Sequence, residues 1–537
     1  MQGSAPKKTI SDYSAGPEKI ARVISDKRRI FVTAGVMVGM FLAAIEATAV
    51  STAMPTVVSS LGGLNIYSWV FSAYFLTSTV TLPLWGKLSD LYGRRIFYVI
   101  GITIFLLGSA LSGQSESMLE LIIFRAIQGI GGGALLTLGM IIIGEIFSLE
   151  ERARVQGLFG GVWGLSSIAG PLLGGFITDH FSWRWVFYLN IPFGLIAALI
   201  MGLAFKERID KSKKVSLDYK GAIIISTLIT LLLTGLMKIG KENGLDSPPT
   251  LLMLLICIPL FWIFISAEKR AEDPILPLEL FSNPFFKTSA ITGFLIGMAM
   301  FGSISFLPLF IQGVIGTTAT RAGMILSPLL LSWVFFSSIS GRLMLGFGYR
   351  PLILVGTAIV TIGFLLLTRM NEETKQLNAI LNMLFLGSGM GMIFIPLLLS
   401  VQNSVPRNRL GIATSATQFF RLIGATVGVS VMGVVMNAFM HQGLNTSANG
   451  LSADQLPYIK NPDLILNPAV REQISPEVLG PLREILAHSL HYVFIAGLVM
   501  AVLAFLSSFL IPKGRVEDKA LEKYNYVGSK KEQIKER

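Results

Sequence analysis

Two ionisable residues lie inside long apolar stretches of this chain, where a charge is costly. Glu46 lies within Phe41–Pro55, and Arg125 lies in the apolar stretch 118–144. A charge at such a depth costs several kcal/mol unless it is paired, hydrated or neutralised. We therefore expect Glu46 to face a cavity and to be able to take up a proton, because burial favours the neutral form of a carboxyl group. The alternative is that Glu46 is a permanent member of an ion pair.

The natural partner for Arg125 is Glu46, although a backbone carbonyl could also accept its hydrogen bonds. Protonation of Glu46 would release such a pair, which makes the pair a candidate two-state switch for proton coupling. The alternative is a static strut between the first and the fourth apolar stretch. Arg421 is a second basic residue at depth, and no acidic residue accompanies it in the spans of the C-terminal half. It could attract an anionic substrate group, a lipid headgroup or a backbone carbonyl, or it could be structural.

A short charged turn separates the second and third apolar stretches. It covers Gly86–Arg95, and its glycines let two helices approach closely and turn sharply. We predict a gating latch in which Asp90 meets the end of a helix from the other half of the protein. A weaker copy covers Gly341–Arg350, with Leu345 at the position of Asp90. A turn repeated across two hydrophobic halves indicates a transporter built from repeats. The charged residues of the first turn are Lys87, Asp90, Arg94 and Arg95.

Glycine and proline are concentrated in the fifth apolar stretch, at Gly170, Pro171, Gly174 and Gly175. They remove side chains and weaken helical hydrogen bonds at one place, which suits a helix that flexes or presses on a neighbour during transport. Simple close packing is the alternative. Another glycine run, Gly129–Gly133, lacks the Gly-Lys-Ser/Thr sequence of a phosphate-binding loop. We therefore expect an ion gradient, and no cofactor, to supply the energy.

The composition is that of a polytopic membrane protein. The 537 residues are 52% hydrophobic and 14% charged, with a mean hydropathy of +0.65, whereas soluble domains hold roughly 25% charged residues. The net charge of +12 follows the membrane faces rather than a nucleic-acid-binding element. Cys257 is the only cysteine and the four histidines lack further ligands at metal spacing, so we expect no metal site. We find no pairing of a nucleophile with a base in the sequence, so we do not expect an enzyme.

Fourteen apolar windows are long enough to cross a bilayer, which requires roughly 20 residues each. Most of the 44 lysines and arginines fall on one side if both termini are cytoplasmic, as the positive-inside rule demands. The predicted fold is therefore an all-α, multi-pass protein of the cell membrane. The windows are 30–54, 66–86, 95–113, 118–144, 154–178, 184–205, 220–238, 249–268, 286–311, 322–341, 351–369, 376–400, 409–438 and 489–511.

These windows divide the chain into two six-helix bundles with two helices inserted between them. The predicted N-terminal bundle covers 30–205 and the C-terminal bundle covers 286–511, with an outer loop at 437–488. The other predicted segments are a cytoplasmic N-terminal segment at 1–29, a basic linker with the two inserted helices at 206–285, and a cytoplasmic tail at 512–537.

Several motifs together resemble the major facilitator superfamily, and its fourteen-helix drug:proton antiporter branch of the EmrB/QacA type in particular. The motifs are Gly86–Arg95, Arg125–Gly133, Gly170–Gly175, Ser182–Pro192, Pro308–Gln312 with Ala322-Gly323, and Gln402-Asn403 with Phe420-Arg421 and Gly424. The resemblance implies export of amphipathic, often cationic compounds in exchange for protons. That branch usually has Asp at the position of Glu46. The C-terminal spans also lack the acidic residues of some relatives, which argues against a strong preference for dications.

We therefore predict a monomeric, proton-coupled multidrug exporter that works by alternating access and contacts only membrane lipids besides its substrates. Glu46 would carry the proton and compete with a cationic substrate. Aromatic and methionine side chains could line a pliable apolar cavity. The proposed lining, besides Glu46 and Arg421, is Tyr67, Trp69, Gln128, Trp163, Phe301 and Met390.

Three alternative functions remain at this point. A carrier of the same fold could move lipids or lipid-linked molecules. Transport of nutrients or siderophores is a second alternative, although sugar carriers usually have more hydrogen-bonding side chains in their spans. A membrane sensor is the third, and the chain has no sizeable soluble output domain.

Overall fold

A computed structural model describes residues 26–513 except 148, 206, 208–217, 240–246, 272–273, 275, 406–409, 449–465, 467–470 and 472–475. These described residues form helices joined by short turns, without a strand. The first half of the chain contains α2 (Asp26–Leu61), α3 (Tyr67–Tyr92), α4 (Arg94–Gln114), α5 (Met118–Ile146), α6 (Leu149–His180), α7 (Arg184–Tyr188) and α8 (Asn190–Ala204). The remaining helices are α9 (Tyr219–Ile239), α10 (Pro248–Arg270), α11 (Pro284–Leu309), α12 (Ala319–Phe347), α13 (Tyr349–Leu367), α14 (Gln376–Ser404), α15 (Leu410–Ala448) and α18 (Pro476–Ser508).

The helices follow the predicted apolar windows. Eleven of the described helices are long and apolar enough to cross a membrane. The other three windows coincide with α3, α6 and α9, of which α9 contributes a shorter apolar segment at Lys220–Gly235. The all-α, multi-pass fold class is therefore confirmed, and the arrangement is consistent with the predicted count of fourteen.

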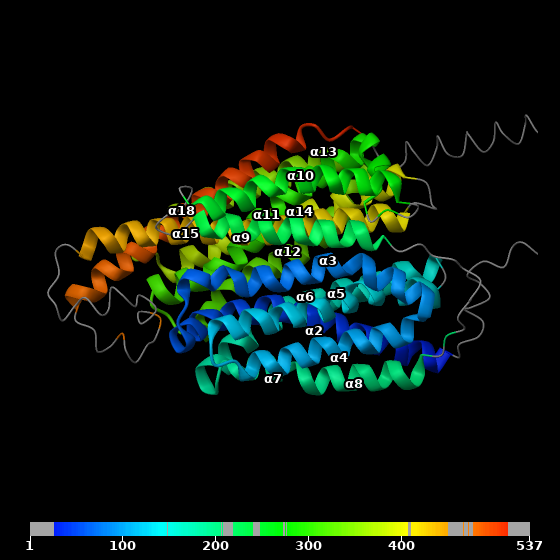
Figure 1. The fold of residues 1–537 in the computed structure, drawn as a ribbon, viewed down its shortest axis with the longest axis horizontal. Coiled ribbons are helices and arrows are strands. Elements are labelled where there is room, and N and C mark those ends of the chain that lie inside the picture. The colour runs from blue at the N-terminus through cyan, green and yellow to red at the C-terminus, as the bar shows by residue number, and fades with distance from the viewer. Residues whose placement is uncertain are drawn as a thin grey trace, which may run out of the picture.

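The helices form two groups. Helices α2–α8 form the first half, in which α2 packs on α5, α6 and α8 while α5 also packs on α3 and α4. Helices α11–α18 form the second half, in which α14 packs on α12 and α13 while α11 packs on α15 and α18. Figure 1 shows the first half in blue and cyan beside the second half in green to red. This is the two-bundle arrangement predicted from the sequence.

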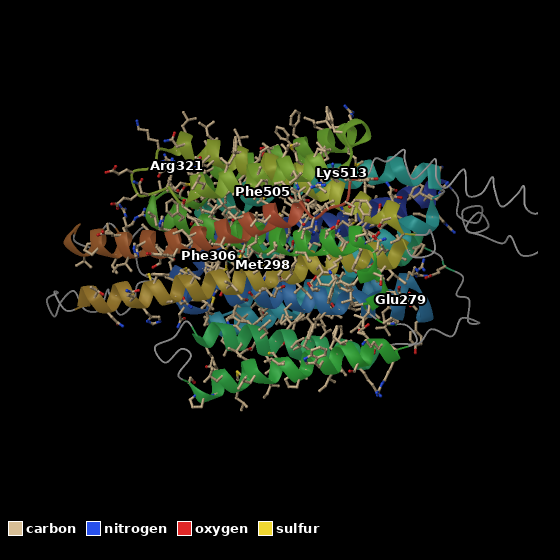
Figure 2. The ribbon with its side chains drawn as sticks, turned by 90° about the horizontal axis from the view of Figure 1, so that it is seen from above. Glu279, Met298, Phe306, Arg321, Phe505 and Lys513 are labelled. Atoms are coloured by element: carbon tan, nitrogen blue, oxygen red, sulfur yellow. The ribbon has the colours of Figure 1, made fainter. Side chains whose placement is uncertain are left out.

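The inserted helices α9 and α10 lie at one edge of the bundle. They pack on each other, and α9 also touches α3 and α15, one helix from each half. Figure 2 shows the pair in green along that edge. An apolar cluster joins the pair to both halves, and its buried members include Leu76, Leu233, Phe264, Phe286 and Phe419. Burial of this surface fixes the pair beside the junction of the halves.

The two halves are held together at the end of the bundle where Leu61 lies, which we call the Leu61 end. Between the halves α6 packs on α12, α3 on α15 and α2 on α11. Hydrogen bonds between the halves also gather there, because they involve the end of α2 and the beginning of α3. They include Gln312 Nε2 to the Thr52 carbonyl at 2.8 Å, Tyr67 Oη to the Ser305 carbonyl at 2.5 Å, Ser72 Oγ with Ser430 Oγ at 2.9 Å, and Asn437 Nδ2 to the Asn65 carbonyl at 2.6 Å.

Two helices extend beyond their predicted windows at this same end. Helix α15 continues to Ala448 and α18 already begins at Pro476, so both protrude past the other helices at the left of Figure 1. Helical hydrogen bonding therefore continues into part of the segment predicted as an outer loop. Most of the rest of that loop, most of the linker after Lys206, the N-terminal segment up to Ser25 and the tail from Gly514 lie outside the described residues. The predicted segment boundaries stay predictions.

Candidate functional site

Glu46 lies in the interior of the first half, and both of its carboxylate oxygens are bound. Its side chain is 1% exposed. One oxygen, Oε1, forms an ion pair and hydrogen bond with Nη1 of Arg125 on α5. The other, Oε2, accepts a hydrogen bond of 2.5 Å from Nδ2 of Asn190 on α8. The carboxylate of α2 thus connects three helices of one half.

Arg125 is equally buried and has partners beyond Glu46. Its Nη1 also donates to Oε1 of Gln128 at 2.7 Å, and its Nε donates to the carbonyl of Val70 on α3 at 3.3 Å. The guanidinium lies over the ring of Tyr74, 4.3 Å from the ring centroid. A cation in a dry interior needs this number of partners, because each unsatisfied donor would add a desolvation cost. Gln128 therefore belongs to the first half's polar network.

Asn190 completes the network, and sequence reasoning gave it no role. Its Nδ2 donates to Oγ of Ser109 on α4 at 2.9 Å as well as to Glu46. Ser109 in turn donates to the Phe187 carbonyl at 2.8 Å. The sequence did contain a signal for this role, namely the side-chain amide of Asn190 in an otherwise apolar window. A buried amide needs hydrogen-bond partners. The chain of contacts runs through α2, α3, α4, α5 and α8.

The network has unused hydrogen-bonding capacity next to the ion pair. Nε2 of Gln128 and Oη of Tyr74 are buried and have no hydrogen-bond partner among the described residues. If Glu46 took up a proton, the ion pair would be lost, yet Arg125 would keep Gln128, the Val70 carbonyl and the Tyr74 ring. The arrangement can therefore lose one charge without leaving the other entirely without partners.

The glycines of α6 bring this helix into direct contact with both halves. A Cβ at Gly170 would overlap Thr48, and one at Gly174 would lie 2.5 Å from the Ala49 carbonyl, both on α2 close to Glu46. On its other side, a Cβ at Gly175 would overlap the Ala319 carbonyl of α12. Pro171 lies there too, and its carbonyl occupies the space that a Cβ of Gly323 on α12 would need. Close packing accounts for the three glycines but not for the proline ring, and the role of all four residues in gating stays a prediction.

Each of the two repeated turns contains a glycine with positive φ between its helices. Gly93 joins α3 to α4 with φ 102°, and Gly348 joins α12 to α13 with φ 80°. In the first turn the backbone N–H groups of Arg94 and Arg95 donate to Oε2 of Glu207, at 2.6 and 3.2 Å. The side chains of Lys87 and Asp90 lie outside the described residues. The predicted latch therefore stays a prediction.

The remaining predicted cavity residues lie on several helices, and their role in substrate binding stays a prediction. Tyr67 and Phe301 lie where α3 meets α11, with the Phe301 ring 5.1 Å from that of Phe75. Trp69 packs on the side of α3 next to α9, and Met390 is fully buried within the second half. The side chain of Trp163 lies outside the described residues. Arg421 lies on α15 next to the ring of Phe394.

The comparisons with known proteins all point to one family. The model of the Major Facilitator Superfamily matches residues 36–429. The multidrug transporter protein MdtP of Bacillus subtilis is 38% identical, over 92% of this chain and 95% of its own. Multidrug resistance protein 3 of the same organism is 36% identical, over 91% and 96%. Among solved structures, an inward-facing bacterial homologue of the human lysosomal transporter Spinster has a TM-score of 0.63 at 16% identity, covering 91% of this chain and 98% of that one.

Proposed function

The chain belongs to the major facilitator superfamily, and on this premise we propose that it is a secondary active exporter that exchanges amphipathic, often cationic compounds for protons. Two relatives named as a multidrug transporter and a multidrug resistance protein match nearly the whole chain and support the choice of cargo. It is a multi-pass membrane protein whose family membership indicates a transporter rather than an enzyme. Its substrates are small molecules, and we propose that it acts as a monomer in the cell membrane.

One observation carries the proton-coupling part of the proposal, namely the burial of Glu46 against Arg125 and Asn190. In our proposal a proton binds to Glu46 and breaks its ion pair with Arg125. Helix α2 can then shift against α5 and α8. A cationic substrate competes with the proton for the negative charge of Glu46. Substrate and proton therefore bind in alternation, and one is released when the other binds. The Glu46–Arg125 pair is then a two-state element that both ligands bias, as coupling requires.

We further propose that the end of the bundle where Asp26 lies faces the cytoplasm. The hydrogen bonds between the halves at the Leu61 end would then close the outer side. Packing of α6 on α12 next to the Glu46-bearing helix α2 gives a physical route from the ion pair to this closure. Alternating access consists of opening this contact while the opposite end closes.

The test uses the purified protein in liposomes with an imposed pH gradient. Glu46→Gln keeps the shape of the side chain but cannot become charged, so pH-driven export of a cationic dye should be abolished. Exchange of an uncharged amphipathic dye without a gradient should persist, because it needs alternating access but neither a proton nor the charge of Glu46. Glu116→Gln, at an exposed position between α4 and α5, serves as the matched control and should export normally.

Full pH-driven export by Glu46→Gln, with a thermal unfolding transition like that of the unmutated protein, would refute the coupling role. Export of a fluorescent phospholipid instead of the dye by the unmutated protein would favour the alternative of a lipid carrier.

A further inference from the structure

Unlike Arg125, Arg421 has no acidic partner among the residues that the structure describes. Its guanidinium carbon lies 5.2 Å from the centroid of the Phe394 ring, within the range of a cation–π contact. Its Nε is buried and has no hydrogen-bond partner among the described residues. The rest of the side chain is partly exposed. Among the described residues, this guanidinium is therefore held by a ring rather than by an acid.

No acidic residue in the membrane windows of the second half can neutralise it. The six windows from 286–311 to 489–511 contain neither Asp nor Glu. In the first half, the carboxylate of Glu46 is occupied by Arg125 and Asn190. The interior of the protein thus combines a neutral ion pair in one half with an uncompensated positive charge in the other. Such a charge within a membrane protein is expensive and indicates a function.

Arg421 lies on a helix that also contacts the other half. Phe394 on α14 packs against Trp333 on α12 at 5.5 Å as well as against Arg421 on α15, and all three side chains are partly exposed. Helix α14 lies next to both α12 and α15, which are the helices that contact α6 and α3 of the first half. The neighbouring Ile393 is fully buried and faces Gly356 of α13 instead. We call Trp333, Phe394 and Arg421 the Arg421 cluster.

We propose that the Arg421 cluster binds the anionic group of a transported amphiphile, so that the substrates include aromatic carboxylates or sulfonates besides cationic compounds. A guanidinium offers two parallel N–H donors to such a group, and the rings of Phe394 and Trp333 offer apolar faces to the aromatic body. This inference rests on the proposed exporter function and specifies a substrate class for it. A phospholipid headgroup shares the same anionic chemistry, so the test must separate it from a transported compound.

The experiment compares two dyes with one aromatic body, a carboxylate-bearing xanthene and its uncharged-carboxyl methyl ester. Binding to the full-length protein is measured by fluorescence anisotropy, and export is measured in liposomes. For Arg421→Gln we expect the affinity for the carboxylate dye, relative to the ester, to fall at least about tenfold, as loss of a charge-assisted hydrogen bond predicts. Arg421→Lys keeps the charge but loses the two parallel N–H donors of the guanidinium. Its affinity for the carboxylate dye, relative to the ester, should lie between those of the unmutated protein and Arg421→Gln. Arg369→Gln removes the same charge at an exposed position and should leave the ratio unchanged.

Equal affinities of the unmutated protein for both dyes would overturn the proposal, as would an unchanged ratio in Arg421→Gln. Copurified phosphatidylglycerol that disappears in Arg421→Gln, while the dye ratio stays constant, would assign the cluster to lipid and also overturn it. Failure of the exporter function gives a different pattern, since neither dye would then be exported although the binding ratio could still depend on Arg421.

Discussion

The carboxylate of Asp179, at the end of α6, accepts a hydrogen bond of 2.7 Å from the backbone N–H of Thr320, in the first turn of α12. Its other oxygen accepts from the N–H of Ala319 at 3.1 Å. The N-terminus of a helix has free N–H groups and a positive dipole end, so a carboxylate is favourable there. Because α6 belongs to the first half and α12 to the second, this cap joins the halves at the Leu61 end.

We predict that Asp179→Ala weakens the closure of the Leu61 end. Loss of a carboxylate at a helix N-terminus removes about 1 kcal/mol, which corresponds to roughly a fivefold shift of a two-state equilibrium. Cysteines placed at Asn65 and Asn437, which are hydrogen-bonded across the halves, in a Cys257→Ser background would report it through their rate of disulfide formation. That rate should fall several-fold in Asp179→Ala. An unchanged rate, or an equal fall in the exposed-acid control Glu116→Ala, would contradict the prediction.

A second prediction concerns Asn190, whose amide holds the Glu46 carboxylate. Asn190→Ala removes a hydrogen bond to a buried charged group, which is worth about 1.5–3 kcal/mol. We expect a lower unfolding temperature in detergent and slower pH-driven dye export. Ser109→Ala is the matched control, because it loses neutral hydrogen bonds while the contact of Asn190 with Glu46 stays. Its loss of stability should be the smaller of the two. Similar losses of stability in both variants would show that the hydrogen bond from Asn190 to the Glu46 carboxylate contributes no more than a neutral one.

The sequence predicted the fold class and the depth of the charged residues because both depend on composition. A span is recognisable from its own 20 or so residues, and so are Glu46 and Arg125 as costly exceptions within spans. Their meeting as an ion pair follows from the scarcity of other partners. Asp179 and Asn190 gave a weaker signal, because their roles depend on which distant helix packs beside them. The contact of Asp179 with Thr320 arises only when α6 meets α12, and polar residues at the ends of spans are otherwise ordinary.

The repeated turn gives a third prediction, which tests whether the two halves use glycine for the same reason. Gly93 and Gly348 have φ values of 102° and 80°, where a side chain is strained. Alanine at either position should lower the free energy of unfolding by about 1–3 kcal/mol. Gly346 is the matched control, because it lies in the exposed last turn of α12 with open space around it. Gly346→Ala should be neutral or slightly stabilising, since alanine favours a helix. Thermal unfolding in detergent measures all three variants, and a Gly348→Ala protein as stable as Gly346→Ala would show that the second turn tolerates a side chain.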